Sequence, residues 1–296
     1  MSEVGRQHGT IRGQLVRPRN IAAAMLGSIH EESTAVSVGM RGALVTGRTL
    51  QMALVPVLLE AFGQRWFERG TIALEFRDGV LDQEEIQGVI EAPPPGARDV
   101  QVRAWLERPS GVEVARGTVS VGDPDVPPAL SAQDPMLHDA PAYDLIAAYT
   151  PGTQFPTCTV TIGADSAQRW DAALPSLSWF TGGSPWGGPI ASPAALTTAL
   201  TAGCTAHRRL FPIDGIAVDG AIEIRNIAGP AFLDTPYRIS SRIIGRGRSP
   251  RTEYFWYESA MDDQQGCRVA EMRMKLRWMP HAPRRPAGST AATATG

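Results

Sequence analysis

The sequence predicts an α+β fold in which one unit, a central helix wrapped by an antiparallel sheet, occurs twice. Each half of the 296-residue chain contains an apolar helical segment followed by four segments with the alternating pattern of β-strands. Corresponding segments of the two halves are separated by a nearly constant offset of about 150 residues. Such an offset is typical of a duplicated, domain-sized unit.

The first half begins with a short predicted strand, "TIRGQLVR", and a loop. A buried helix is predicted over 47–63, because its apolar residues recur at helical spacing and Gly63 is a natural helix stop. These apolar residues are Leu50, Leu54, Val57, Leu58 and Phe62. Four strands are then predicted between Gly, Pro and Asp turns, in "TIALEFRDGV", "EIQGVIEA", "DVQVRAWLER" and "GVEVARGTVSVG".

The second half repeats this order. A strand is predicted in "TCTVTIG", a loop in "WFTGGSPWGG" and a helix rich in small residues in "PIASPAALTTALTAGCTAHRRL". Four strands follow in "GIAVDGAIEIRN", "TPYRISSRIIG", "RTEYFWYESAM" and "CRVAEMRMKLRWM". We expect the two units to lie side by side and to join their sheets, which would cover two otherwise exposed edges.

The predicted boundaries follow from this repeat. An N-terminal repeat over 1–122 and a C-terminal repeat over 150–281 flank a linker over 123–149 that concentrates proline and acidic residues. Such a segment is not expected to form a sheet ladder. The last segment, 282–296, is rich in Pro, Ala, Ser and Thr and is predicted to be a disordered tail.

Composition excludes several classes of function. The 28 basic and 30 acidic side chains nearly cancel and form no basic segment, so the chain has no electrostatic footprint for nucleic acid, and a small, nearly neutral ligand fits better. Three widely spaced cysteines indicate neither a zinc cluster nor a disulfide framework, and a reducing cytoplasm is expected. No signal peptide or membrane span of about 18 apolar residues is recognisable. No metal or redox cofactor is implied.

The stretch 28–47, "SIHEESTAVSVGMRGALVTG", places a histidine ahead of a glycine-punctuated apolar run at the entrance to the first helix. This stretch resembles the motif of MaoC-like enoyl-thioester hydratases and dehydratases, which have the double hotdog fold. Their motif reads Asp-x-Asn-Pro-Ile/Leu-His, with an alanine a few residues later and a Gly-Pro-x-Ala-x-Gly-like entry to the central helix. The matching residues are Ile29, His30, Ala35, Gly39, Gly42, Leu44, Val45 and Gly47. The resemblance in architecture covers roughly residues 10–280.

The sequence departs from this motif at the position of the family aspartate. That aspartate lies five residues before the histidine, where this chain has Met25, and Gly27 and Ser28 replace the Asn-Pro pair. The equivalent loop of the second half, "LPSLSWFTGGSPWGG", contains neither aspartate nor histidine, and Ser192-Pro193 replaces the glycine at the helix start. We therefore expect the first half to carry the chemistry and the second half to be degenerate.

The resemblance implies a site at the start of the first helix. His30 is the predicted general base, and backbone N–H groups around Gly42, Val45 and Gly47 are the predicted donors to a thioester enolate. Glu31 and Glu32 are candidate replacements for the missing aspartate, although two acidic residues here are also typical of a solvated helix start.

Two tryptophans of the second-half loop are further candidates. Trp179 and Trp186 are predicted to line an apolar acyl tunnel, with core packing as the alternative.

The resulting hypothesis is a MaoC-like lyase that hydrates, dehydrates or otherwise moves a proton on an acyl-thioester or polyketide-like substrate, including isomerisation or cyclisation. Coenzyme A or an acyl carrier protein would carry the substrate, and the protein would be a homodimer or a pseudo-dimeric monomer. Two alternatives are an acyl-CoA thioesterase, which would have to use Thr46, Thr49 and Gln51, and a non-catalytic acyl-binding or partner subunit, which the missing aspartate favours.

Overall fold

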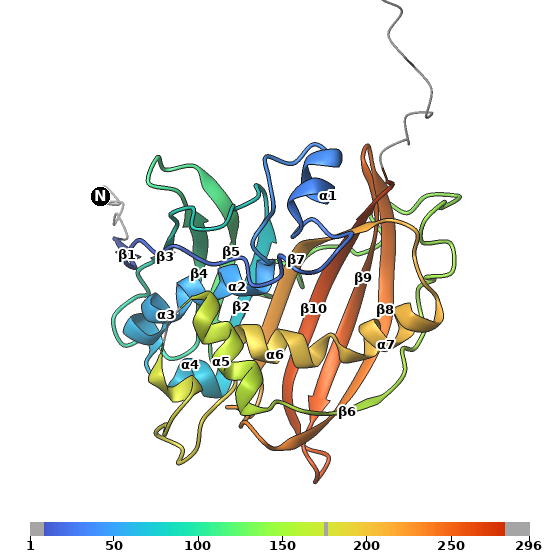
Figure 1. The fold of residues 1–296 in the computed structure, drawn as a ribbon. Helices are drawn as coiled ribbons and strands as arrows, with labels where there is room; N and C mark the ends of the chain where they lie inside the picture. The colour runs from blue at the N-terminus through green and yellow to red at the C-terminus, as the bar shows by residue number, and fades with distance from the viewer. Residues whose placement is uncertain (1–8, 175–176, 282–296) are drawn as a thin grey trace, which may run out of the picture.

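A single antiparallel sheet of ten strands forms the body of the protein (Figure 1). The computed structural model describes residues 9–174 and 177–281, so the predicted tail lies outside the described residues. In sheet order the strands are β1 (Thr10–Arg12), β3 (Gln87–Glu91), β4 (Val100–Glu107), β5 (Glu113–Val121), β2 (Gly70–Phe76), β7 (Ile216–Asn226), β10 (Arg268–Met279), β9 (Thr252–Asp262), β8 (Pro236–Ser249) and β6 (Cys158–Thr161).

The strand order shows the internal repeat. The first five strands of the sheet come from the first half and the last five from the second, in mirrored order, and β2 pairs with β7 at the junction. In that pairing Ile72 is opposite Ile224 and Leu74 is opposite Ile222, so the apolar core continues across the junction. The predicted α+β fold, with two joined sheets, is confirmed.

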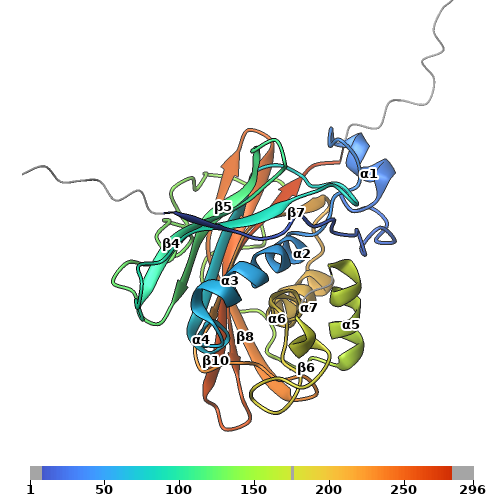
Figure 2. The same cartoon turned by 90° about the vertical axis from the view of Figure 1, so that its left-hand side faces the viewer.

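The helices cover one face of this sheet (Figure 2). The first half contributes α1 (Glu32–Ser37), α2 (Gly47–Gln51), the 3-10 turn η1 (Met52–Leu54), α3 (Val55–Phe62) and α4 (Arg65–Arg69). The second half contributes α5 (Ala164–Ala173), η2 (Ser178–Phe180), α6 (Pro193–Leu200) and α7 (Ala202–Leu210). Among the described residues, none of these helices has both the length and the apolar character that crossing a membrane requires.

The predicted helix over 47–63 is broken into three consecutive segments. Pro56 has no N–H with which to continue the α-helical pattern, and the turn before it, η1, is 3-10. Helix α3 ends as predicted at Gly63, which has a φ of +62°. Leu54, Val57 and Leu58 are buried in the core between helices and sheet, so the predicted apolar face is the packed face.

The segment between β5 and β6 forms no strand, and its first part packs on the other face of the sheet. Leu130 is buried against Tyr254 and Trp256, and Ser131 donates to the buried carboxylate of Glu223 through both its N–H and its hydroxyl. Further along, Glu253 accepts three backbone N–H bonds from residues 144–146. The connection between the repeats is therefore held against the sheet by specific contacts. The predicted domain boundaries stay a prediction.

Candidate active site

A cavity of about 210 Å³ lies where the first-half helix entrance meets β7 of the second half. Its walls come from the loop before α1, the start of α2, the loop after β2 and the strands β7 and β10. The lining residues are Ile29, His30, Met40, Leu44, Val45, Gly47, Leu50, Phe76, Arg77, Asp78, Gly79, Val80, Val218, Asp219, Gly220 and Arg277. Three of the predicted site residues, His30, Val45 and Gly47, are thus brought together.

His30 is held in this wall by its backbone and by its ring. The His30 carbonyl accepts a hydrogen bond from Asn20 Nδ2 at 2.8 Å, and the ring Nδ1 lies 2.7 Å from the Leu44 carbonyl oxygen. A carbonyl oxygen can only accept, so Nδ1 carries the proton in this contact. In the neutral imidazole Nε2 then keeps its lone pair, which is the state that a general base requires.

Glu31 and Glu32 do not line the cavity. The Glu31 carboxylate accepts hydrogen bonds from the Gly27 N–H and from the hydroxyls of Thr34 and Ser33, and these bonds, that from Gly27 first, lower its pKa. Glu32 is exposed, and its Oε2 accepts the Ala43 N–H at 2.7 Å. Both acids brace the loop around α1, as expected for a helix start, and a catalytic role for either stays an untested prediction.

The start of α2 brings backbone close to the cavity. Thr46 caps the helix through its Oγ1, which accepts the Thr49 N–H. A Cβ placed on Gly47 would lie 2.6 Å from the Phe76 ring and 3.2 Å from the Asp219 Cβ, so only glycine fits between the helix and these two strands.

The N–H groups of this region differ in availability. Those of Ala43, Leu44 and Val45 donate to Glu32, to the Ile29 carbonyl and to the Val80 carbonyl. The N–H of Gly47, in the first turn of α2, has no acceptor among the described residues. Gly42 is buried against the Glu32 carboxylate and does not line the cavity.

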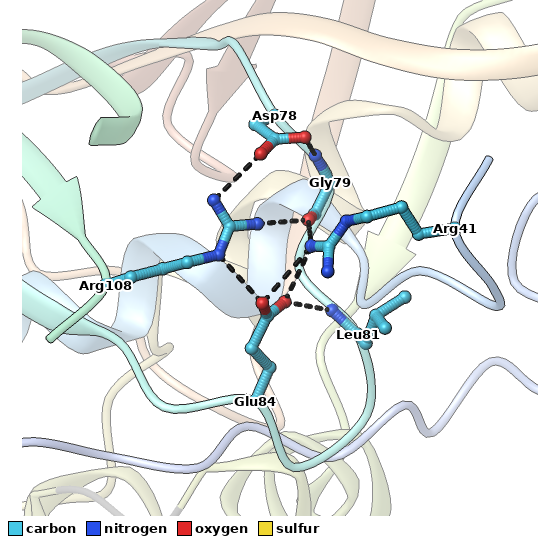
Figure 3. Close-up of polar contacts among 6 residues, drawn as sticks. All are labelled: Arg41, Asp78, Gly79, Leu81, Glu84 and Arg108. Atoms are coloured by element: carbon cyan, nitrogen blue, oxygen red, sulfur yellow. Dashed lines mark hydrogen bonds and ion pairs between the residues drawn. The ribbon is translucent and has the colours of Figure 1, made fainter. Parts of the chain in front are cut away.

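Ion pairs fix the loop that follows β2 and forms one wall of the cavity. Figure 3 shows Glu84 between two guanidinium groups, with Arg108 Nε at 2.8 Å and Arg41 Nη2 at 3.1 Å from its carboxylate oxygens. Arg108 also binds Asp78 at 2.8 Å and the Gly79 carbonyl at 2.9 Å. The cluster therefore ties the loop to β4 and to the segment between α1 and α2.

The pKa of Glu84 shows how strongly this cluster favours the anion. Burial by itself raises that pKa, but hydrogen bonds from Arg108, from the Leu81 N–H and from Arg41 outweigh burial and lower it to about 2. Glu84 thus stays ionised at any pH at which the protein is expected to work.

The equivalent place in the second half is closed. The Val45 N–H donates to the Val80 carbonyl in the first half, and the Ala191 N–H donates to the Ala231 carbonyl in the second, both at 2.8 Å. The second position encloses only about 10 Å³, with Pro193 in the place of Gly47 and with Trp66 and Phe67 in its wall.

Trp179 and Trp186 belong to this closed region. Both pack edge-on against Phe67, with ring centroids 5.7 and 6.0 Å from it, and Trp186 Nε1 donates to Glu68. Neither lines the cavity that holds His30. The structure therefore places them in core packing, the alternative to the tunnel, and a role in binding stays a prediction.

Asp219 is the residue of this cavity that sequence reasoning missed. It lies in β7, 189 residues after His30 (219 − 30), and faces the same cavity from the other half of the chain. The available signal was the Asp-Gly pair inside a strand pattern, because an internal glycine often marks a β-bulge. In the described part of the chain, no three His, Cys, Asp or Glu side chains converge as a possible metal site.

Comparisons with known proteins identify the fold. No family model and no curated protein sequence match the chain. A Chloroflexus aurantiacus protein assigned as a MaoC-domain dehydratase matches its structure with a TM-score of 0.60 at 13% identity, over 93% of this chain and 96% of that protein. A double hotdog protein of Mycobacterium tuberculosis matches with a TM-score of 0.57 at 13% identity, over 92% and 96%.

A third solved structure comes from another class. A Lactobacillus plantarum protein assigned as an oleoyl thioesterase matches with a TM-score of 0.52 at 10% identity, over 94% of this chain and 99% of that protein. These likenesses show that the chain has the double hotdog fold, as predicted, and that MaoC-like dehydratases share it.

Proposed function

We propose that this double hotdog protein acts on an acyl-thioester or polyketide-like substrate, with His30 as the general base of a hydration, dehydration or related proton transfer. The observation that carries the proposal is the hydrogen bond from His30 Nδ1 to the Leu44 carbonyl, which leaves Nε2 as a proton acceptor in a largely apolar cavity. The fold supports it, because MaoC-like dehydratases are among the proteins that share it.

The cavity suits the acyl end of such a substrate. Its volume of about 210 Å³ is below the roughly 300–1,000 Å³ of sites that enclose a drug-sized ligand. A short acyl chain would therefore enter, and coenzyme A or an acyl carrier protein would remain outside. The Gly47 N–H would donate to the thioester oxygen as negative charge develops there, with no side chain in the way.

Hydration would proceed by proton transfer through His30. Nε2 would remove a proton from water while the oxygen attacks C3 of the enoyl group, and the C2=C3 electrons would move onto the thioester. The imidazolium would then return the proton to C2, which gives the 3-hydroxyacyl thioester. An imidazole suits both steps because it binds and releases protons near neutral pH.

The test is to incubate the protein with crotonyl-CoA and with 3-hydroxybutyryl-CoA and to separate the products by liquid chromatography. Addition or removal of water supports the proposal, release of free CoA supports a thioesterase, and no reaction with either supports a binding role. His30→Gln should lower kcat/KM about 100-fold or more, whereas His138→Gln, an exposed histidine of the linker, should not. Unchanged activity in His30→Gln would contradict the assignment.

We also propose that the chain acts as a pseudo-dimeric monomer. The ten-stranded sheet already joins two hotdog units through β2 and β7, as two subunits would be joined in a dimer of single units. Light scattering coupled to size-exclusion chromatography should give the mass of one chain, 31.8 kDa. Twice that mass would contradict the proposal.

A further inference from the structure

The carboxylate of Asp219 faces the His30 cavity without a protein partner. Its side chain is half-buried and lines, from β7, the same cavity as His30. Within residues 9–174 and 177–281 this carboxylate forms no hydrogen bond or ion pair. A partly buried carboxylate loses hydration, so one that has no partner in the protein is suited to bind a ligand or water.

A β-bulge sets the direction of Asp219. Lys275 of β10 is opposite Ala221, but the next residue, Leu276, is opposite Asp219, so Gly220 is an extra residue in β7. A Cβ on Gly220 would lie 2.7 Å from Arg277 Nε, so the glycine lets the Arg277 side chain pack against the bulge. Bulges redirect the adjacent side chains of a strand, and this one brings the Asp219 Cβ to the entrance of α2, next to Gly47.

The other acids near the site are engaged elsewhere. Glu31 and Glu32 hold the loop around α1 and do not line the cavity. Asp78 lines it but binds Arg108 at 2.8 Å and the Gly79 N–H at 2.9 Å. Met25, at the place of the family aspartate, is 54% exposed. Among the carboxylates that line the cavity, Asp219 is therefore the one left available.

From this geometry we infer that Asp219 is the catalytic carboxylate that works with His30, supplied by the second half in place of the missing family aspartate. The inference rests on the proposed function. The attacking water has two O–H groups. Asp219 accepts a hydrogen bond from the one that stays intact, while His30 Nε2 takes the proton of the other. The O–C3 and H–C2 bonds form, the C2=C3 π bond is lost, and Asp219 remains a carboxylate throughout.

The test compares variants of both residues in the full chain. Asp219→Asn keeps the size of the side chain and removes the negative charge, and we expect kcat for crotonyl-CoA hydration to fall about 100-fold or more with KM little changed. Asp219→Glu should retain part of the activity. Asp214→Asn, a fully exposed acid in the loop before β7, should match the unmodified protein. The double variant His30→Gln/Asp219→Asn should be little worse than His30→Gln, because both residues act in one step.

The outcomes separate this inference from the proposed function. Activity that depends on His30 but is unaffected by Asp219→Asn overturns the role of Asp219 and leaves the proposed function intact. A multiplicative loss in the double variant shows that the two residues act independently and also overturns the inference. Absence of any turnover that depends on His30 overturns both. Thermal unfolding of each variant shows whether a loss of activity comes from misfolding. If Asp219→Asn is misfolded, the activity that Asp219→Glu retains tests the role of the carboxylate.

Discussion

Replacing Glu84 by glutamine tests the ion cluster that holds one wall of the cavity. The difference between the ordinary value of 4.5 and a pKa of about 2 corresponds to about 3 kcal/mol in favour of the ionised carboxylate. The Glu84 side chain is only 21% exposed, so solvent screens this interaction weakly. Glu84→Gln should therefore lower the free energy of unfolding by about 2–3 kcal/mol at pH 7, which is about 5 °C in Tm for a chain of this size.

The pH dependence gives a second and sharper test. A carboxylate whose pKa is lowered in the folded state stabilises the protein above its unfolded pKa, and this contribution is lost as the pH falls through the folded value. For Glu84 the window runs from about pH 4.5 down to about pH 2. The difference in stability between the unmodified protein and Glu84→Gln should therefore be constant from pH 7 to pH 5.5 and should shrink below that.

Urea denaturation followed by tryptophan fluorescence, repeated from pH 7 to pH 3, measures both effects. The matched control is Glu85→Gln, because Glu85 pairs with Arg17 at the surface, where the two side chains are 38% and 63% exposed. Such an exposed pair contributes about 0–1 kcal/mol. Two results would contradict a stabilising cluster. One is a loss of unfolding free energy at pH 7 that is no larger for Glu84→Gln than for Glu85→Gln. The other is a loss for Glu84→Gln that is as large at pH 3 as at pH 7.

Three further substitutions probe the cavity and its closed counterpart. Gly47→Ala should reduce kcat/KM and destabilise the protein by about 1–3 kcal/mol, because its Cβ would lie 2.6 Å from the Phe76 ring. Steady-state kinetics and urea denaturation measure the two effects. Unchanged kinetics would contradict a close approach of the substrate to the Gly47 backbone. Met25→Asp should leave kcat/KM within about twofold, because residue 25 is exposed and not in the cavity; a large gain would show that the family geometry can still form. Phe67→Ala should lower the free energy of unfolding, measured by urea denaturation, by about 3–5 kcal/mol, because Phe67 is 3% exposed and contacts both loop tryptophans. A smaller loss would mean that the second-half position stays closed without the Phe67 ring.

The repeated fold was predictable because its signals are local. Helical spacing places Leu54, Val57 and Leu58 on one face, and the structure buries all three. The break of the central helix at η1 was not predicted, although Pro56, which lacks an N–H, stands in the sequence. The periodicity of apolar residues continues through such a break, so the pattern alone does not show it.

Only the first-half part of the candidate site could be predicted from the sequence. A motif identified His30, Val45 and Gly47, which share the cavity because the loop and the helix start are close in sequence. Asp219 could not be placed in the same way, because its position depends on the pairing of β2 with β7 and on a one-residue bulge. The pattern of a strand indicates which of its faces is buried, but it does not show which strand it pairs with at the junction or where a bulge interrupts the pairing.

The same limit explains the acidic residues and the tryptophans. Glu31 and Glu32 adjoin His30 in sequence, but the turn into α1 directs them to backbone and hydroxyl donors outside the cavity. Trp179 and Trp186 contact each other, with ring centroids 5.7 Å apart, and they pack against Phe67 of the first half, a contact that their place in the sequence does not reveal.

The bulge in β7 also bears on what gene duplication made possible. Two identical subunits joined through the same strand must present the same residue twice, at symmetry-related positions. In a single chain, β2 and β7 have diverged. The core residues Ile72 and Leu74 of β2, which has no bulge, correspond to Ile222 and Ile224 of β7 at an offset of 150 residues (222 − 72). Because Gly220 is an extra residue, the position of Asp219 corresponds to that of Gly70 (219 − 149). An acid can therefore be placed beside one helix entrance and omitted from the other. The two halves of this chain are therefore not bound by the symmetry of a dimer, and the proposed site predicts that one substrate binds per chain.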